Sequence, residues 1–329
     1  MGKHQNGHKK GINKYFIFVI SVVCIIGIIF FIWSFLVKDN PRHEKSLAEP
    51  DFSQEISNVS SDQTRGTTQE VTAETTSETT SETTSETSLE STTTKESEKE
   101  ELYSAAQPLL KEAANVSYGV YYFQHQDFLS NENNQPMIAA SIIKVFILEY
   151  LYEKIKNTEL TEATQINGLT LVQLAQQMIQ ISDNEATNVL IDYFGMENLN
   201  QYFIKAGYQQ TLLQRKMLDT QAQEMGLENY TSLTDTMSFL KKMYHNQNDY
   251  PYNEMFQIMT GQQIGTKIRL KLPNYIIANK TGELPGVEND IGIIMSADPF
   301  AIVILSNGVT NSEMMRQSIA NFALAASQN

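Results

Sequence analysis

The sequence predicts an α+β fold of two lobes, in which an antiparallel sheet with flanking helices carries an inserted all-α lobe. Segments rich in β-branched and aromatic residues lie near both ends of residues 101–329, and a long run of helical patterns separates them. A single sheet built from both ends, with the helical middle as an insertion, is the economical arrangement of these elements. A transmembrane helix and a disordered stalk are expected to precede this domain.

Charge divides the chain into three parts. Its 329 residues are enough for one or two domains, and a formal net charge of -14 argues against a nucleic-acid partner. Residues 1–38 carry five Lys and no acidic residue, whereas residues 39–100 have a formal charge of -10 and residues 101–329 a formal charge of -9. A basic head, an acidic middle and a mildly acidic body indicate three physically different segments.

Residues 15–37 carry no charged side chain. As a helix they would extend about 34 Å, slightly more than the ~30 Å hydrocarbon core of a bilayer. The run ends in bulky residues and offers no small-residue cleavage site, which favours an uncleaved anchor over a signal peptide. The Lys-rich residues 1–14 are therefore predicted to form a cytoplasmic tail, with the rest of the chain outside a single-pass anchor in the cell membrane.

Residues 38–100 are predicted to be a disordered stalk rich in Ser, Thr and Glu. Apolar residues are sparse there, and Glu74–Ser88 repeats the sequence E-T-T-S almost without variation. Such a segment cannot bury enough apolar surface to fold, so we expect a hydrophilic spacer between membrane and domain. The sequence leaves open whether the stalk is glycosylated.

Residues 101–329 have a globular composition, and their patterns predict a succession of helices and strands. Helices are expected at 105–114, 141–154, 171–180, 184–194, 234–244 and 311–326, and strands at 116–123, 275–280, 291–295 and 301–305. A functional site in such a fold should lie at the seam between the two lobes.

The first candidate motif is Ser141-Ile142-Ile143-Lys144, at the start of a predicted helix. Residues three apart share a helix face, so the lysine amine can reach the serine hydroxyl and, if neutral, take its proton. The apolar residues around the pair favour a partly buried, neutral lysine. Ser238 and Lys241 match the same spacing, but there an ordinary helix surface is the simpler interpretation.

Two further tripeptides carry possible chemistry. Ser182-Asp183-Asn184 precedes a predicted helix, where Ser182 and Glu185 also match a capping box. Lys280-Thr281-Gly282 ends a predicted strand, where the glycine would let a ligand approach the backbone closely, or would simply mark a turn.

The three motifs occur in the order S-x-x-K, S-D-N, K-T-G, which resembles the signature of the penicillin-recognising serine enzymes, including class A β-lactamases and penicillin-binding proteins. The resemblance covers about residues 101–329, and the segment from Gly265 to Ile294 is similar to the class A pattern in particular. It implies the two-lobed β-lactamase/transpeptidase-like fold, which agrees with the arrangement inferred from the order of helices and strands.

The resemblance also implies roles for individual residues. Ser141 would be the acylated nucleophile, Lys144 its proton acceptor and Ser182 the hydroxyl that passes a proton to the leaving nitrogen. Asn184 would hold the amide of the substrate. Lys280 and Thr281 would bind the substrate carboxylate, and the backbone N–H groups of Ser141 and Glu283 would form the oxyanion hole. Asp183 is expected to orient its own loop.

One departure from the class A pattern concerns deacylation. In that family a loop between the second and third motifs carries an Arg and, two residues on, a Glu that activates water. Here Arg215 matches the arginine, and the Glu position falls on Met217, which cannot act as a base. Asp219, Glu224 and Glu228 lie nearby and stay open as substitutes, so the simplest expectation is acylation without fast deacylation.

These observations predict an extracellular, membrane-anchored serine hydrolase acting on amide bonds. Its substrates would be β-lactams or the acyl-D-alanine amides of cell-wall peptides, so D,D-peptidase activity is open. The alternative is a non-catalytic or slowly acylating cell-wall binding or sensing module on the same fold. A G-x-S-x-G elbow and an H-E-x-x-H zinc motif are both missing from the sequence, and His125 and His245 read as surface residues. We expect no cofactor and no metal; the oligomeric state is open.

Overall fold

The computed structural model describes residues 99–328, all within one compact unit of the chain. The predicted membrane span at 15–37 and the predicted stalk lie outside the described residues. Within residues 99–328, no helix is both long enough and apolar enough to cross a membrane.

An antiparallel sheet of five strands organises the domain, in the order β2-β1-β9-β8-β7. The strands are β1 (Ala113–Tyr122), β2 (Phe128–Ser130), β7 (Ile276–Leu284), β8 (Val287–Met295) and β9 (Phe300–Val309). β1 pairs directly with β9, with Val120 opposite Ile302. The prediction of one sheet built from both ends of the domain is therefore confirmed.

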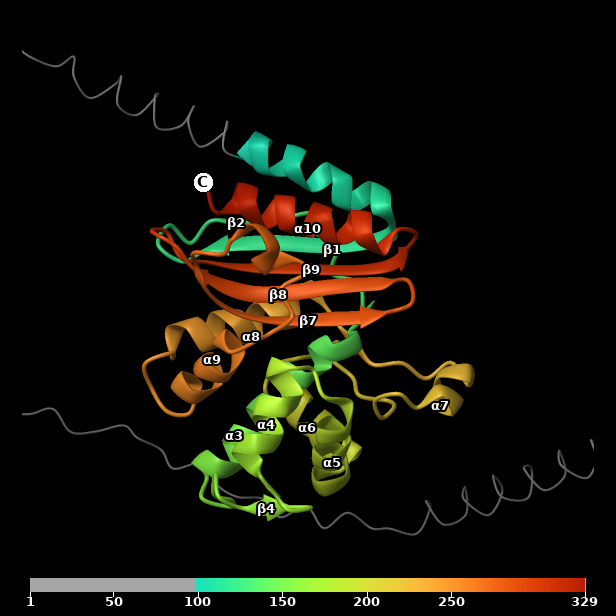
Figure 1. The fold of residues 1–329 in the computed structure, drawn as a ribbon, viewed down its shortest axis with the longest axis vertical. Helices are drawn as coiled ribbons and strands as arrows, with labels where there is room; N and C mark the ends of the chain where they lie inside the picture. Colours follow the sequence, from blue (N-terminus) through green and yellow to red (C-terminus); the bar gives the residue numbers. More distant parts are fainter. Residues whose placement is uncertain (1–98, 329) are drawn as a thin grey trace, which may run out of the picture. The chain divides into compact units, whose positions relative to one another are not determined.

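Each face of the sheet packs against its own set of helices (Figure 1). On the outer face, residues 99–112 form a helix that lies beside α10 (Ser312–Ala326), and on the other face lies α8 (Leu233–His245). Side chains alternate accordingly: Val120 and Ile302 belong to the outer core, whereas Val303 belongs to the core shared with the helical lobe. This alternation follows from the two-residue repeat of a strand.

The helical lobe surrounds α3 (Ile143–Lys156), which is buried on almost every side from Ile143 to Tyr152. Its other elements are α4 (Leu171–Gln180), α5 (Asn184–Phe194), α6 (Met196–Lys205), the short α7 (Thr220–Glu224) and α9 (Tyr252–Thr260). Two short strand pairs complete it: β3 (Met137–Ile138) with β6 (Tyr230–Thr231), and β4 (Gln165–Ile166) with β5 (Leu169–Thr170).

Within residues 99–328 each predicted helix and strand is present, but several boundaries differ. The first helix ends at residue 112, two residues before its predicted end, because the strand β1 already begins at Ala113. β7 continues to Leu284, beyond the predicted end at Lys280, and β8 begins at Val287. Gly286 has a φ of 77°, which permits a tight turn between them, so the pairing extends through charged residues that look like loop in the sequence.

Candidate active site

Ser141 lies in a single 3-10 turn, η1 (Ala140–Ile142), that leads into α3. Two contacts hold the residues just before it. Asn289 of β8 donates from Nδ2 to the carbonyl of Ile138 at 2.8 Å, and the Ala139 amide donates to the Asn229 carbonyl at 2.8 Å. Ser141 is itself partly exposed, so its hydroxyl lies at an accessible point of a turn that is fixed by buried partners.

Gly282 of β7 allows this turn to lie against the edge of the sheet. A Cβ atom at residue 282 would be only 2.9 Å from the Ala139 carbonyl oxygen and 3.3 Å from the Ala140 Cβ. The sequence suggested that this glycine admits a ligand or marks a turn, but the group that approaches it is the turn that carries Ser141. Because residue 282 has no Cβ, the turn that carries the candidate nucleophile has room to pack against β7.

Lys144 is completely buried, which goes beyond the partial burial that its apolar surroundings predicted. Its Nζ donates to the Ser182 carbonyl at 2.7 Å and to Asn184 Oδ1 at 2.9 Å, and lies 3.2 Å from Ser182 Oγ. Burial lowers the pKa of Lys144 to about 7, although the charge of Asp183 acts in the opposite direction. The amine is thus poised near neutral pH, but the hydrogen bonds of its Nζ go to the second motif and none goes to Ser141.

Ser182 has a φ of 58°, a left-handed conformation that is uncommon for a residue with a side chain. It does not form the capping box that the sequence suggested. The N-cap of α5 is Asp183, whose carboxylate accepts from the Ala186 amide at 2.6 Å. Asp183 was expected to orient its own loop, and it does so by capping the helix. The hydroxyl of Ser182 is therefore free to contact the amines of Lys144 and Lys280.

Lys280 connects the two lobes. It extends from β7, is fully buried, and donates from Nζ to Ser182 Oγ at 2.9 Å and to the Thr281 carbonyl at 2.7 Å. Burial lowers the pKa of Lys280 well below its ordinary value, and the nearby Lys144 lowers it further. One hydroxyl, Ser182 Oγ, therefore lies between two buried amines, and burial lowers the pKa of both.

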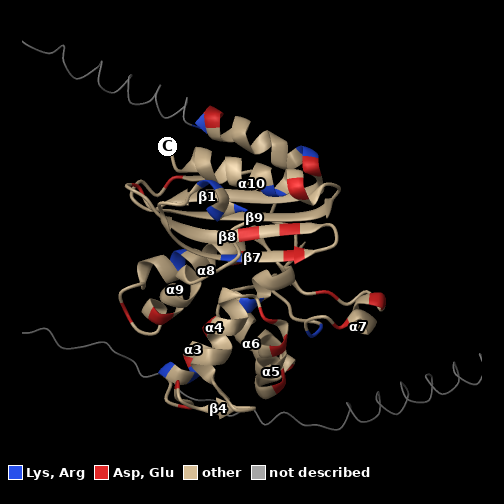
Figure 2. Ribbon diagram, in the orientation of Figure 1, with Lys and Arg blue, Asp and Glu red and all other residues tan. Residues whose placement is uncertain are grey.

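Glu283 was expected to contribute only its backbone N–H, but its side chain has a structural place. Its carboxylate pairs with the buried Lys267 at 2.9 Å and with Arg316 at 3.3 Å, and both of these also pair with Glu288. Burial would raise the pKa of Glu283, but Lys267 and Arg316 hold it below its ordinary value. Figure 2 shows acidic positions along β7 and β8 near the turn that joins them.

Sequence reasoning missed this charge network and its buried neighbour Asp290. Asp290 accepts from the Ile268 amide at 3.0 Å and from Asn279 Nδ2 at 3.0 Å. Burial raises the pKa of Asp290 to about 6, against the effect of Lys267. The available signal was the spacing of Glu288 and Asp290, two apart in a strand, which places both on one face. Thr281, opposite Asp290 in the sheet, is buried beside them.

The loop after α6 is closed by a buried ion pair. Arg215 donates from Nε to Glu228 Oε1 at 2.8 Å, and its Nη2 lies 2.7 Å from the same oxygen. Asn229 ties the two ends together, because its Oδ1 accepts from the amides of Gln214 at 2.8 Å and Arg215 at 3.1 Å. These contacts close the loop that contains Arg215 and Met217.

Met217 is held against α5 within that loop. Asn188 donates from Nδ2 to the Met217 carbonyl at 3.1 Å and accepts from its amide at 2.8 Å through Oδ1. Asn188 lies one helical turn after Asn184, so both asparagines share the face of α5 that leads to Lys144. The side chain of Met217 is buried.

The three acidic residues that could replace the missing Glu differ in their surroundings. Glu228 pairs with Arg215, and Asp219 caps α7 by accepting from the Ala222 amide at 2.9 Å. Glu224 is exposed on α7. Two of the three carboxylates are thus engaged within the loop.

No group of three or more His, Cys, Asp or Glu side chains among residues 99–328 is arranged to hold a metal ion. His125 is exposed in the turn after β1 and His245 is exposed at the end of α8, as predicted. Ser238 is also exposed on α8, which agrees with its interpretation as ordinary helix surface.

Solved structures share this fold at low sequence identity. A β-lactamase from Sphaerobacter thermophilus has a TM-score of 0.62 at 22% identity, over 70% of this chain and 96% of that one. A β-lactamase from Chitinophaga pinensis has a TM-score of 0.64 at 18% identity, over 70% and 98% of the two chains. PBP-A has a TM-score of 0.59 at 22% identity, over 68% and 96%.

The amino-acid sequence was also compared with curated proteins and with models of protein families. None of the curated proteins compared with the chain matches it significantly. The model of the family described as "Beta-lactamase enzyme family" does match, over residues 101–329, and this span includes all three motifs that meet at Ser182. The chain therefore belongs to the β-lactamase enzyme family.

Proposed function

We propose that this protein is an extracellular, membrane-anchored serine hydrolase that is acylated at Ser141 by β-lactams or by acyl-D-alanine-like amides. The observation that carries the proposal is the position of Ser182 Oγ, 3.2 Å from Lys144 Nζ and 2.9 Å from Lys280 Nζ. This contact brings residues of all three motifs to the seam between the lobes, beside the turn that holds Ser141.

Acylation begins with removal of the Ser141 proton. A lysine with a pKa of about 7 is partly neutral at neutral pH, so Lys144 can accept this proton. The Ser141 oxygen then bonds to the carbonyl carbon and the C–N bond of the amide breaks. The proton passes from Lys144 through the Ser182 hydroxyl to the leaving nitrogen, along the contact already formed between them.

In this mechanism, residues of the second and third motifs bind the substrate. The substrate carboxylate is placed beside Lys280 and Thr281, where its negative charge would raise the pKa of the buried Lys280 and favour the ammonium form. Asn184 presents its side-chain amide to the substrate amide, and the backbone N–H groups of Ser141 and Glu283 are assigned to the oxyanion hole.

Deacylation is proposed to be slow. Met217 stands where the class A pattern has its water-activating Glu, and a thioether has no useful basicity. Glu228 and Asp219 make the loop contacts described above, which leaves each less available as a base. A related case supports acylation by a β-lactam: a mutant of PBP-A is known as an acyl-enzyme complex with penicillin G.

The predicted anchor at residues 15–37 and the spacer at 38–100 support an extracellular position for the domain. That position would bring it to the peptides of the cell wall, whose acyl-D-alanine amides resemble β-lactams in the bond that reacts. The preceding Lys-rich residues favour a cytoplasmic N-terminus.

Mass spectrometry of the full-length protein after exposure to benzylpenicillin tests the proposal. We expect an adduct of one intact penicillin on Ser141 that persists for minutes or longer, and no adduct in the Ser141→Ala variant. Ser238→Ala, which changes the exposed serine of the same S-x-x-K spacing, is the matched control and should label normally. If the folded wild-type protein forms no adduct, the alternative of a non-catalytic cell-wall binding module is favoured.

A further inference from the structure

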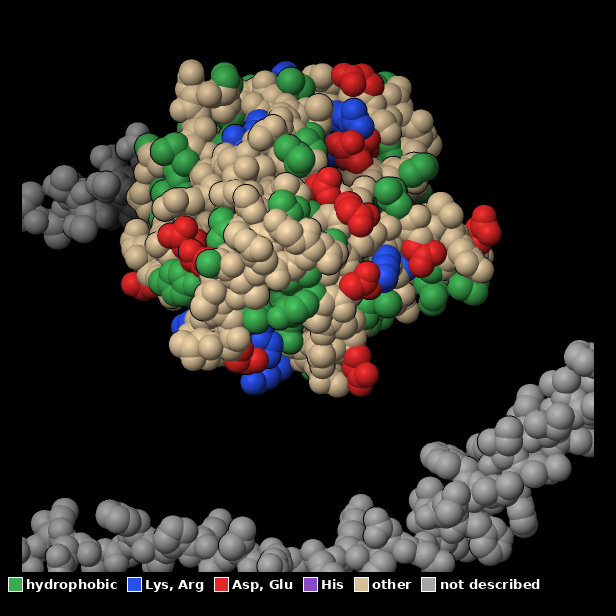
Figure 3. Space-filling view, turned by 60° about the horizontal axis from the view of Figure 1, so that its bottom comes forward, with side chains coloured by type: hydrophobic (Ala, Val, Ile, Leu, Met, Phe, Trp, Pro, Cys, Tyr) green, Lys and Arg blue, Asp and Glu red, His purple; other side chains and the backbone are tan. Residues whose placement is uncertain are grey.

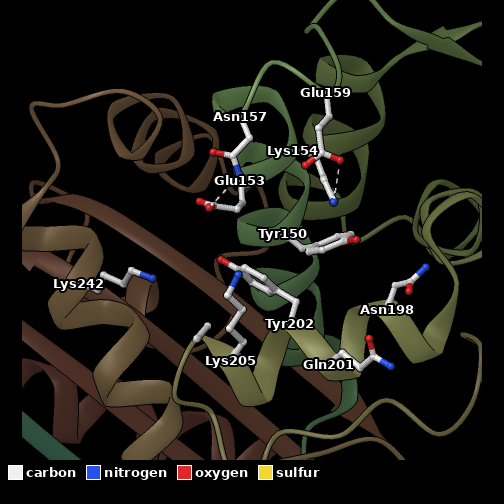
Figure 4. Close-up of a pocket in the computed structure, with 11 residues that line it drawn as sticks. Tyr150, Glu153, Lys154, Asn157, Glu159, Asn198, Gln201, Tyr202, Lys205 and Lys242 are labelled. Carbon is white, nitrogen blue, oxygen red and sulfur yellow. Dashed lines mark hydrogen bonds and ion pairs between the residues drawn. The ribbon is translucent and has the colours of Figure 1, made fainter. Parts of the chain in front are cut away.

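A cavity of about 470 Å³ lies in the helical lobe, away from the three motifs. It is lined by the C-terminal half of α3, by α6 and by Lys242 of α8 (Figure 4). Its volume falls within the range of roughly 300–1,000 Å³ that is usual for small-molecule sites. The proposed reaction at Ser141 makes no use of it.

Two tyrosine rings form the apolar part of this cavity. The rings of Tyr150 and Tyr202 lie 5.0 Å apart between centroids, at an interplanar angle of 59°. In Figure 4 the two rings lie together at the centre of the lining. Tyr150 is buried and Lys154 Nζ lies 5.3 Å from its ring centroid, so the partly exposed Tyr202 offers a ligand the larger ring surface. The face of an aromatic ring carries negative potential, so it attracts the weakly positive C–H groups of a ligand.

Three side-chain amides surround the rings. Each donates one hydrogen bond within the protein: Asn157 to Glu153 at 3.1 Å, Asn198 to the Phe194 carbonyl at 2.8 Å, and Gln201 to Glu197 at 3.2 Å. These bonds fix the direction of each amide. Among the described contacts the amide oxygens accept no hydrogen bond, so each can serve a ligand.

A buried carboxylate holds Lys242 in the cavity lining. Lys242 pairs at 2.7 Å with Glu149, which is almost fully buried. Glu149 also accepts from the hydroxyl of Tyr208 at 2.7 Å and from that of Tyr252 at 3.2 Å. A buried carboxylate with three partners is satisfied and holds the lysine in place.

The charges of the cavity balance. Lys154, Lys205 and Lys242 line it, and they are matched by Glu153 and Glu159 in the lining and by the buried Glu149. Lys154 pairs with Glu159 at 2.8 Å. The face of the molecule in Figure 3 likewise has acidic and basic side chains interspersed, without an expanse of one sign. The field therefore favours a polar ligand of little net charge over a polyanion.

The cavity is distinct from the proposed active site. Both are built on α3, but Lys144 lies in its first turn and Lys154 in its last. Ten residues of helix separate these two side chains by about 15 Å along the axis. A ligand in the cavity and an acyl group on Ser141 can therefore be held at the same time.

We propose that this cavity binds a short oligosaccharide of N-acetylated amino sugars. The Tyr202 ring, supported by Tyr150, packs against the C–H face of a sugar ring, and the amides and carboxylates exchange hydrogen bonds with its hydroxyl and acetamido groups. The choice of acetamido sugars rests on the proposed function, because the peptides of the cell wall are attached to sugars of this kind.

Saturation-transfer NMR on the full-length protein in detergent micelles, with N,N′,N″-triacetylchitotriose as the probe, tests this site. We expect transfer to the ring protons of the sugar, and a Kd that rises about tenfold, equivalent to about 1.4 kcal/mol, in Tyr202→Leu and in Gln201→Ala. The matched controls Tyr193→Leu and Gln221→Ala change exposed residues outside the cavity and should bind as the wild type does.

Gln201 is exposed, so its variant keeps the test valid if Tyr202→Leu fails to fold. Absence of transfer to the sugar, or equal transfer in the Gln201→Ala and wild-type proteins, would overturn the proposal. So would tight binding of poly(glycerol phosphate) with no binding of the sugar. Penicillin labelling of Ser141 is measured on the same samples. A protein that binds sugar but forms no adduct would refute the proposed function and leave the saccharide site standing.

Discussion

Ser182 Oγ touches two buried amines, and this arrangement determines how the site should respond to pH. Lys144 has a pKa near 7 because burial disfavours its ammonium form, and Lys280 is shifted in the same direction. Interacting groups titrate as a pair, so an apparent pKa for acylation belongs to both amines. Lys144 must be neutral to accept the Ser141 proton, which the Ser182 hydroxyl then relays to the leaving nitrogen.

Acylation of Ser141 should therefore accelerate as pH rises. The depressed pKa means that Lys144 is protonated below about pH 7 and neutral above it, so the rate of acylation should fall about tenfold for each pH unit below 7 and level off above it. Stopped-flow labelling with a fluorescent penicillin, from about pH 5 to about pH 9, measures this. A rate that does not change through pH 7 would contradict the role of Lys144 as the base.

A second prediction concerns Met217. Met217→Glu places a carboxylate where the class A pattern has its base, and a well-placed base commonly contributes about 10²–10⁴-fold. The lifetime of the Ser141 adduct, followed by mass spectrometry, should shorten. Leu218→Glu is the control, because the side chain of Leu218 is 72% exposed whereas that of Met217 is buried. An unchanged lifetime in Met217→Glu would mean that the loop does not present residue 217 to the adduct.

At the scale of elements, the contact between β7 and η1 should be sensitive to a single methyl group. Gly282→Ala would place a Cβ 2.9 Å from the Ala139 carbonyl, so the turn that holds Ser141 must shift. Since small misplacements of reacting groups are costly, penicillin labelling should slow by about 10²-fold. Gly265→Ala is the control, because its nearest neighbour would be 3.8 Å away. Equal labelling rates for the two variants would refute this role of Gly282.

The loop should depend on its buried ion pair. Arg215→Ala leaves the carboxylate of Glu228 buried without its partner, a loss that typically costs about 3–5 kcal/mol. A fall in Tm is therefore expected. Adding Glu228→Gln removes the orphaned charge and should restore part of the loss. If the double variant melts no higher than the single one, the cost comes from lost packing and not from the unpaired charge.

Sequence patterns predicted some elements better than others. The ranges of α4 and α5 match the predicted ones because each has an amphipathic repeat and a polar cap in the preceding residue. The network of Lys267, Glu283, Glu288 and Arg316 was not predictable, because no local pattern indicates which distant charges meet. The cap by Asp183 was missed for another reason: Ser182 also matched a capping motif, and only its left-handed backbone distinguishes the two.

The meeting of the three motifs was inferred from a family resemblance and not from spacing. Nothing in the distance along the chain between Lys144 and Lys280 requires their amines to share one hydroxyl. The fold brings them together because β7 forms the edge of the sheet that faces the start of α3. Lys144 was expected to reach Ser141, but its burial among the backbone carbonyls and side chains of the second motif draws its hydrogen bonds there.

For the whole molecule, the prediction concerns topology. If residues 15–37 anchor the chain with its N-terminus in the cytoplasm, protease added to intact, wall-stripped cells should release the domain. The released fragment, identified by mass spectrometry, should begin between Asp39 and Glu100, since the folded domain resists cleavage. A domain that stays protected until the membrane is broken would contradict the predicted orientation.

The position of β1 has a consequence for how the domain is made. β1 is the first strand of the described chain, yet its longest pairing is with β9, the last strand. Strands that lie far apart in the sequence must close a long loop before they can pair, and the entropy cost of closing that loop slows folding. The five-stranded sheet cannot be completed until residues 300–309 have been synthesised, because β9 lies between β1 and β8. A chain truncated before Phe300 should therefore leave the apolar strand β1 without its main partner, available for aggregation.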